Sequence, residues 1–435
     1  MAEKNDYIKN SFWALLEKAA RIISGILVGV LVARYLGKDQ FGLISYALSV
    51  LAIFTVISTL GLDGLVVREL ITRPDKKYEI MGTAFSLRFL GSFVVILLAS
   101  TYSYFRDTDE QFWIVVIVSI SIFFQSWSVI DFYFQSQVKG RFIAINQVIT
   151  LLISAIVKLV FIYINAPVQW FAAMAVFEAM LTMFNQLIFY KRQGEFTRNW
   201  FFTKSEAKIL FISASPIILS IFMQMLYQKS DQILILRYLR DIGLVGQYAA
   251  AIRISEASFF IPVALSAALL PGIIKNRDNE ELQLKRLTQI FSLMIWSALI
   301  ISIGGLIFGD WVIQLLYKDK FDLAPAIFKI HIWITIPVFL GTAWGSWLLA
   351  INKLKILTIF QALVLPIAIG LEMYCIPRWG VFGAAKAIVS AFYISIIFMF
   401  TLYKPKLVTG LFIAALNPRN IVEIFTYWKE NRKAE

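Results

Sequence analysis

The chain has 435 residues, of which 59% are hydrophobic and 16% charged, and its formal net charge is +13. Soluble globular domains carry about 25% charged residues, so this balance excludes an ordinary soluble domain and indicates a protein whose solvent is lipid. The single Cys375 excludes an internal disulfide and the single His331 excludes a multi-histidine metal site, so no metal ion or other cofactor is expected.

Long apolar segments recur along the chain from residue 11 to residue 403. Most have enough residues to cross a hydrocarbon core about 30 Å thick. The first segment lacks the short apolar core and small-residue cleavage site of a signal peptide, so we expect it to be retained. The sequence therefore predicts an all-α, polytopic membrane protein with about twelve transmembrane helices over residues 11–36, 41–62, 82–102, 111–133, 142–164, 168–190, 209–236, 245–270, 287–309, 326–350, 356–375 and 380–403.

The basic residues between these segments predict how the chain is oriented. If twelve spans alternate, 25 of the 41 Lys and Arg residues lie on the side of the N-terminus and 8 lie on, or at the span ends facing, the opposite side. Because cytoplasmic loops carry the excess of Lys and Arg, we expect both termini to be cytoplasmic. The basic residues are dispersed over short loops and do not form one folded patch, so nucleic acid is not an expected partner.

The two halves of the chain share a short pattern. Residues 32–36 read VARYL and residues 235–239 read ILRYL, and each is followed by a polar turn and a helix that opens with a glycine. This pattern predicts a parallel repeat of two six-helix lobes. Transporters with two such lobes bind their substrate near the bilayer midplane, at the interface of the repeats.

We place these lobes at residues 1–205 and 206–403. Residues 404–435 are then a basic cytoplasmic tail. Within it, residues 407–418 are too few to span the bilayer, so we expect them to form an interfacial helix.

Charged residues inside the predicted spans are the main functional signal. An unpaired charge near the bilayer centre costs roughly 2.5–3.5 kcal/mol on insertion scales, so these side chains must face partners or water. The eight cations are Lys18, Arg21, Arg88, Lys158, Lys229, Arg253, Lys329 and Lys386. The five acids are Glu17, Glu178, Asp231, Glu256 and Glu372.

Some of these charges are expected to neutralise one another. Residues three or four apart share a helix face, and residues at similar depth on adjacent spans can meet. Arg88 and Lys229 have no evident local partner. The expected pairs are Glu17 with Arg21, Arg253 with Glu256, Glu372 with Lys386, and Lys158 with Glu178.

The remaining excess of cations suits an anionic substrate such as a diphosphate. Asp231 is a candidate gating or ion-coupling acid. Polar stripes, such as Glu178, Thr182 and Asn185, fit either a sugar-lined cavity or hydrogen bonding between helices, and the pattern alone leaves both open. The candidate substrate-binding residues are Arg21, Arg88, Lys158, Lys229 and Arg253.

Several motifs resemble one transporter family. LVARYLGKDQFGLISYA (31–47) and LGLDGLVVREL (60–70) are similar to the N-terminal signature of Wzx-type O-antigen and polysaccharide flippases, which belong to the multidrug/oligosaccharidyl-lipid/polysaccharide exporter superfamily. Two segments of the second half resemble the same family more weakly, LLYKDKFDLAPAIFKI (315–330) and WGVFGAAKA (379–387). Lys318-Asp319-Lys320 departs from the family, whose members commonly carry a glycine after the tyrosine, and this puts the shape of that loop in doubt.

The resemblance implies a flippase and not an enzyme. Its cargo would be an undecaprenyl-diphosphate-linked oligosaccharide, such as an O-antigen repeat unit for lipopolysaccharide. The flippase would move this cargo from the cytoplasmic to the periplasmic leaflet of a bacterial inner membrane by alternating access. Its partners would be that lipid-linked oligosaccharide and membrane lipids, with a polysaccharide polymerase and chain-length proteins as further candidates. No G-x-x-x-x-G-K-[ST] loop is present, so ATP hydrolysis by this chain is not expected.

Three alternatives stay open at this point. A multidrug antiporter of the same superfamily would carry organic cations and would need an acidic interior. A membrane glycan polymerase or glycosyltransferase would usually need a larger outer loop. A lipid II flippase would commonly have two further spans.

Overall fold

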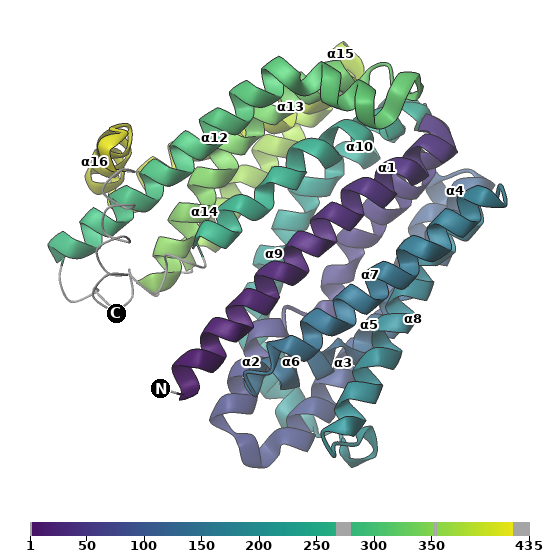
Figure 1. The fold of residues 1–435 in the computed structure, drawn as a ribbon, viewed down its shortest axis with the longest axis vertical. Coiled ribbons are helices and arrows are strands. Elements are labelled where there is room, and N and C mark those ends of the chain that lie inside the picture. The colour runs from purple at the N-terminus through teal and green to yellow at the C-terminus, as the bar shows by residue number, and fades with distance from the viewer. Residues whose placement is uncertain (1, 267–279, 352, 354, 421–435) are drawn as a thin grey trace. The chain divides into compact units, whose positions relative to one another are not determined.

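The computed structural model describes residues 2–266, 280–351, 353 and 355–420, with side chains for residues 25, 27–215, 217–266, 281–351, 353 and 355–420. This described part is helical and contains no strand, which confirms the predicted all-α class (Figure 1). The longer helices are α1 Ala2–Thr59, α2 Asp63–Thr72, α3 Lys77–Arg106, α4 Asp109–Ser119, α7 Gly140–Tyr163, α8 Val168–Arg192, α9 Lys204–Leu239, α10 Ile242–Glu256, α12 Glu280–Tyr317, α14 Thr335–Ala350, α15 Lys355–Leu402 and α16 Pro405–Ala415. The shorter ones are η1 Pro74–Lys76, α5 Ser121–Gln125, η2 Ser126–Ser128, α6 Val129–Ser136, η3 Thr197–Asn199, η4 Ala257–Phe259, η5 Lys318–Lys320, α13 Ala324–His331 and η6 Ile332–Ile334.

Helix length and hydropathy support the predicted number of spans. Within the described residues nine helices are long and apolar enough to cross a membrane, and the bent pair Lys204–Ser215 and Ile217–Leu239 makes a tenth if it counts as one span. Two of the helices that count as single ones contain a non-helical residue, α1 at Gly37 and α15 at Gly380. Dividing each at its glycine gives the twelve predicted transmembrane helices.

Both breaks fall at glycines, where the backbone has a positive φ angle. Gly37 has φ 71° and Gly380 has φ 59°, a region that residues with a Cβ rarely adopt. After Gly380 the chain folds back on itself, since Gly383 packs against the backbone of Cys375. A straight helix would hold residues eight apart about 12 Å from each other along its axis. The sequence VFGAAKA therefore begins a new, returning helix.

The chain divides into two compact units. The N-terminal unit comprises Met1–Leu236 and Asp241–Gly246, and the C-terminal unit comprises Arg237–Arg240 and Gln247–Glu435. The lobe boundary expected at residues 205 and 206 stays a prediction.

In the N-terminal unit α1 packs against α3, α4 and α7, and α7 runs beside α8 (Figure 1). The segment between α8 and α9 is fastened to α3 by side chains: Lys77 Nζ lies 2.6 Å from Glu195 Oε1, and Thr203 Oγ1 donates to Glu79 at 2.7 Å. Arg73 donates to both oxygens of the buried Glu206, at 2.9 and 2.6 Å, and this contact raises the pKa of Arg73 above its usual value. The segment between α8 and α9 is thus held against α3 by side-chain contacts.

The repeated glycines of the two halves meet within this unit. A Cβ on Gly42 would collide with the carbonyl oxygen of Ile242, and a Cβ on Gly246 would collide with that of Lys38. Each glycine therefore lies against the backbone that precedes the other. The close approach explains why both sequence repeats carry a glycine at this place.

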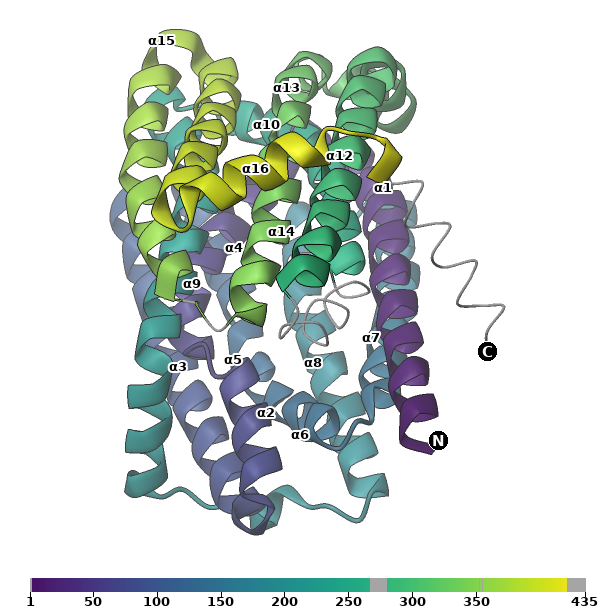
Figure 2. The same cartoon turned by 90° about the vertical axis from the view of Figure 1, so that its left-hand side faces the viewer.

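In the C-terminal unit α12 and α14 pack around a core that includes Phe291, Met294, Phe339 and Trp344. Helix α16 lies across α12 and α15 (Figure 2) and contributes Leu411 to that core. The tail segment therefore contains a helix with one face buried in protein. Its expected interfacial role stays a prediction.

The start of α13 is fixed from α10. Gln247 Oε1 accepts hydrogen bonds at 3.2 Å from the backbone N–H groups of Leu323 and Ala324, and Gln247 Nε2 donates to Asp322 at 2.5 Å. These bonds satisfy N–H groups that a helix start leaves without an intrahelical acceptor. Further along, the buried His331 lies 2.7 Å from Ser255 Oγ. Both contacts join α10 to α13.

Candidate functional site

The expected pair of Lys158 and Glu178 is present. Lys158 Nζ on α7 lies 2.6 Å from Glu178 Oε1 on α8, and both side chains are partly exposed. Ser154, one turn earlier on α7, donates to the same carboxylate oxygen. This confirms the predicted contact across the fifth and sixth spans.

The polar stripe on α8 faces a matching stripe on α7. Asn146 Nδ2 donates to the Thr182 carbonyl at 3.2 Å, and the hydroxyls of Thr150 and Thr182 lie 3.3 Å apart. With Ser154 and Lys158, these α7 residues recur every four positions and so lie on one helix face. For this stripe, hydrogen bonding between helices is the interpretation that the structure supports.

Arg88 has a partner, contrary to the prediction. Its side chain is 5% exposed, and Nη1 donates at 3.0 Å to Asp63 at the start of α2. The guanidinium also lies 5.4 Å from the ring centre of Phe132 on α6. Its Nε is buried without a hydrogen-bond partner in the structure. Asp63 lies one residue beyond the predicted span 41–62, so it is not among the charges expected at membrane depth.

Lys229 and Asp231 lie in the last third of α9. Lys229 is half-buried and forms no ion pair or hydrogen bond with any residue in the described ranges, as predicted. Asp231 is 2% exposed, and its Oδ1 accepts a hydrogen bond at 2.7 Å from the N–H of Gln232. The ammonium of Lys229 is therefore available to a ligand, whereas the carboxylate of Asp231 already accepts a hydrogen bond from the backbone of its own helix.

The other two candidates give different outcomes. Arg253 on α10 forms no ion pair with Glu256, although the structure describes both side chains, so that expected pair is wrong. Arg253 instead lies close enough to Tyr317, at the end of α12, for an electrostatic interaction. Arg21 belongs to α1, but its side chain lies outside the described ones, as does that of its expected partner Glu17.

The pair of Glu372 and Lys386 is also wrong. Glu372 is fully buried, whereas Lys386 is exposed and lies 5.2 Å from the ring centre of Trp379. Within the described part of the chain Lys386 forms no ion pair. Similar depth brought the two residues together in the prediction, but they lie on different faces of the α15 hairpin.

These arrangements divide the cations by what they can bind. Arg88 and Lys158 each hold a carboxylate, while Lys229 and Lys386 hold none among the described residues. Of the described His, Cys, Asp and Glu residues, no group of three or more is placed to hold a metal ion. The chemistry available here is electrostatic recognition of an anion by ammonium and guanidinium groups.

Comparison with solved structures identifies the fold. The chain is similar to "Lipid II flippase MurJ, inward closed conformation", with a TM-score of 0.74, 14% identity, and coverage of 94% of this chain and 91% of that one. It is also similar to an inward-facing multidrug resistance MATE family transporter of the MOP superfamily, with a TM-score of 0.70, 13% identity, and coverage of 90% and 95%. A MOP superfamily transporter from Pyrococcus furiosus gives a TM-score of 0.60 at 12% identity, covering 94% of this chain and 96% of that one. Identities this low show the shared fold alone.

Sequence comparison identifies the family. No curated protein matches the chain. Residues 7–277, more than half of the chain, match the family described as "Polysaccharide biosynthesis protein". With the MOP superfamily fold, this match confirms the resemblance carried by the N-terminal motifs. The chain is therefore a multi-pass membrane protein that belongs to the polysaccharide biosynthesis protein family.

Proposed function

We propose that this protein is a flippase that moves an undecaprenyl-diphosphate-linked oligosaccharide, such as an O-antigen repeat unit, from the cytoplasmic to the periplasmic leaflet of a bacterial inner membrane. The match of residues 7–277 to the polysaccharide biosynthesis family carries this proposal. The flippase-like fold supports it. The protein would translocate its cargo without changing a covalent bond, and both of its termini would be cytoplasmic.

The charges inside the spans support an anionic cargo. Lys229 has no carboxylate to neutralise it among the described residues, and an ammonium at membrane depth is costly unless it has a counter-ion or water. A diphosphate headgroup supplies negative charge and several hydrogen-bond acceptors. We assign Lys229 the role of first contact with that headgroup, with Arg21, Arg88, Lys158 and Arg253 as further candidate binding residues.

The membrane potential would assist this transport. Moving one negative charge outward across 100 mV releases about 2.3 kcal/mol. Asp231 is the candidate for gating or for coupling to an ion, since it is a buried acid within a span. The cargo would enter in an inward-open state and leave in an outward-open state.

A complementation experiment tests the proposal. A strain that lacks its own O-antigen flippase is given this gene, and surface glycan is measured together with the lipid-linked oligosaccharide that accumulates in the inner leaflet. We expect surface glycan to return and the accumulated precursor to fall. Restored resistance to organic cations without restored glycan would instead assign the chain to the multidrug transporters of the superfamily.

A further inference from the structure

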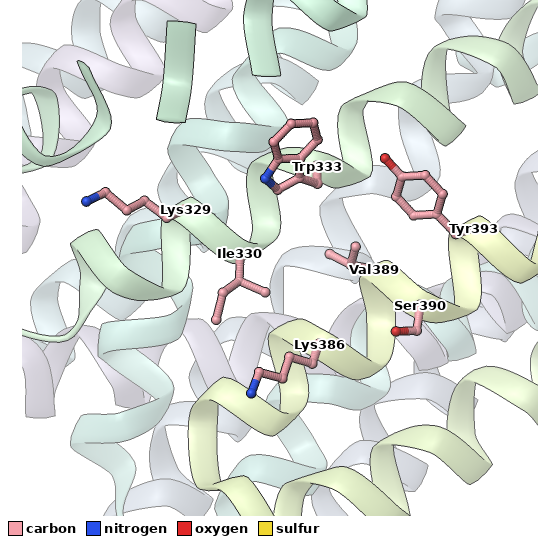
Figure 3. A pocket seen from close by; sticks show the side chains of 7 residues that line it. All are labelled: Lys329, Ile330, Trp333, Lys386, Val389, Ser390 and Tyr393. Carbon is pink, nitrogen blue, oxygen red and sulfur yellow. The ribbon is translucent and has the colours of Figure 1, made fainter. Parts of the chain in front are cut away.

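A pocket in the C-terminal unit lies apart from the residues considered above for transport. It has a volume of about 440 Å³ and opens to the surface of the protein. Its walls come from α13, η6 and the second arm of α15 (Figure 3). The lining residues are Lys329, Ile330, Trp333, Lys386, Val389, Ser390 and Tyr393.

The two lysines differ in how they are neutralised. Lys329 Nζ lies 2.5 Å from Asp310 Oδ2 on α12, and both of those side chains are partly exposed. Lys386 lies over the Trp379 ring and forms no ion pair with any described side chain. Asp310 therefore neutralises Lys329, and Lys386 leaves the pocket with an excess of one positive charge.

The pocket has a charged end and an aromatic end. Lys386 comes six residues after the turn at Gly380 and Lys329 five residues after the start of α13, which places both about 8–9 Å below those helix ends. Tyr393 lies thirteen residues beyond the turn, about 20 Å below it. In Figure 3 the side chain of Lys329 extends to the left and that of Lys386 to the lower left, and the rings of Trp333 and Tyr393 lie above and to the right of them.

This order matches the layers of a membrane lipid. Groups about 8–9 Å inside the helix ends lie at the level where lipid headgroups meet acyl chains. Aromatic and branched side chains below them offer a surface for a hydrocarbon chain. A small soluble anion would use only the lysines and would leave the aromatic end unoccupied.

We propose that this pocket binds the phosphate group of an anionic membrane lipid, with Lys386 on the phosphate, Lys329 adding positive charge at the rim, and the acyl or prenyl chain against Trp333 and Tyr393. Both phospholipid and polyprenyl lipids carry this chemistry. If both termini are cytoplasmic, as given under Proposed function, the pocket lies in the outer leaflet. Binding itself does not depend on that orientation or on transport.

Lipid binding to the purified full-length protein tests the proposal. Native mass spectrometry in detergent would measure how much phosphatidylglycerol, phosphatidylcholine or undecaprenyl diphosphate stays bound across a titration. We expect the wild-type protein to retain phosphatidylglycerol in preference to phosphatidylcholine. Because a hydrogen bond to a charged group is worth about a factor of ten or more, Lys386→Gln should weaken phosphatidylglycerol binding roughly tenfold.

Two matched variants guard against effects on folding. Asp310→Asn frees Lys329 from its carboxylate, so it should bind phosphatidylglycerol more tightly than the wild-type protein does. Lys320→Gln removes an exposed lysine of η5, which does not line the pocket, and should leave binding unchanged.

The source of the lipid follows from the same titration. Retention of both phosphatidylglycerol and undecaprenyl diphosphate would support a site for any anionic lipid phosphate, and retention of the second alone would support a site for the polyprenyl carrier. Equal retention of phosphatidylglycerol and phosphatidylcholine would overturn the proposal, as would equal losses in Lys386→Gln and Lys320→Gln. None of these outcomes measures translocation, so they leave the flippase proposal to its own test.

Discussion

Cations within the spans fall into two kinds, those that contact a carboxylate and those that contact none among the described residues. Arg88 on α3, Lys158 on α7 and Lys329 on α13 each contact a carboxylate at 3.0 Å or less. In α9 and α15, Lys229 and Lys386 contact no carboxylate among the described residues. A phosphate must displace a carboxylate to reach the first kind, whereas it can approach the second kind directly. The comparison therefore separates charges that stabilise the helix bundle from charges that are available to a ligand.

The pair of Arg88 and Asp63 should give the largest change in stability. Asp63→Asn leaves the buried guanidinium of Arg88 without its ion-pair partner, at a cost of about 3 kcal/mol. Arg88→Met removes the buried cation itself and leaves Asp63, which is 69% exposed and stays hydrated, so it should cost less. Thermal unfolding midpoints of both variants in detergent would measure the difference. Equal midpoints for wild type and Asp63→Asn would show that the contact does not stabilise the fold.

The pair of Lys158 and Glu178 should give the next largest change. Glu178→Gln or Lys158→Gln leaves one charge at membrane depth. This costs roughly 2.5–3.5 kcal/mol, and hydration of the remaining charge reduces that cost. The double variant should recover most of that loss, because it leaves neither charge. A thermal-shift double-mutant cycle would measure the coupling between the two residues.

Transport by the same double variant sharpens the comparison. A stable double variant that still exports glycan would make this pair structural. A stable variant that fails to export would make Lys158 a substrate contact as well, and would contradict the division between the two kinds of cation.

Lys229 should show the opposite pattern, a loss of function without a loss of stability. Lys229→Gln should lower glycan export roughly tenfold, the effect of one lost charge contact, while the unfolding midpoint stays at or above that of the wild type. Lys229→Arg keeps the charge and should keep export. Lys208→Gln, an exposed lysine near the start of the same helix, serves as the matched control. Full export by Lys229→Gln would remove this residue from the mechanism.

Asp107, between α3 and α4, should give the smallest effect. Burial raises the pKa of Asp107 above its usual value, although Tyr46 and Ser103 both donate hydrogen bonds to it. A raised pKa means that the folded state binds the proton more tightly than the unfolded state, so protonation of Asp107 stabilises the fold. This contribution is complete below the unfolded pKa, near pH 4, and disappears as the pH rises through the folded value.

An Asp107→Asn variant removes this titration. The wild-type protein should therefore gain stability relative to the variant as the pH falls toward 4. Unfolding midpoints of the two proteins at several pH values would measure the gain. A gap between them that is independent of pH would show that Asp107 has an ordinary pKa.

Sequence reasoning predicted the elements well because their signals are local. Apolar length determined the spans, and the glycines at positions 37 and 380 mark the turns between spans that the structure joins as single helices. Lys158 and Glu178 were predicted because adjacent antiparallel spans bring residues of similar depth together.

The errors arose where depth was known but rotation was not. Glu372 and Lys386 share a depth, yet one is fully buried and the other is exposed, and only the packing of α15 against its neighbours determines which face is which. Asp63 was missed for a related reason, since contact with Arg88 depends on how α2 packs beside α3 and not on sequence spacing. The pocket that Lys386 lines lies between α13 and α15, and no sequence pattern indicates that these two helices are neighbours.

Translocation by the purified protein is the most direct test of an anionic, lipid-linked cargo. Proteoliposomes containing the wild-type chain would be loaded with an undecaprenyl-diphosphate-linked oligosaccharide or, separately, with a lipophilic organic cation, and the initial rate of transfer would be measured for each. The account predicts transfer of the lipid-linked oligosaccharide, a roughly tenfold lower rate for Lys229→Gln, and no transfer of the cation. Transfer of the cation without transfer of the oligosaccharide would contradict it.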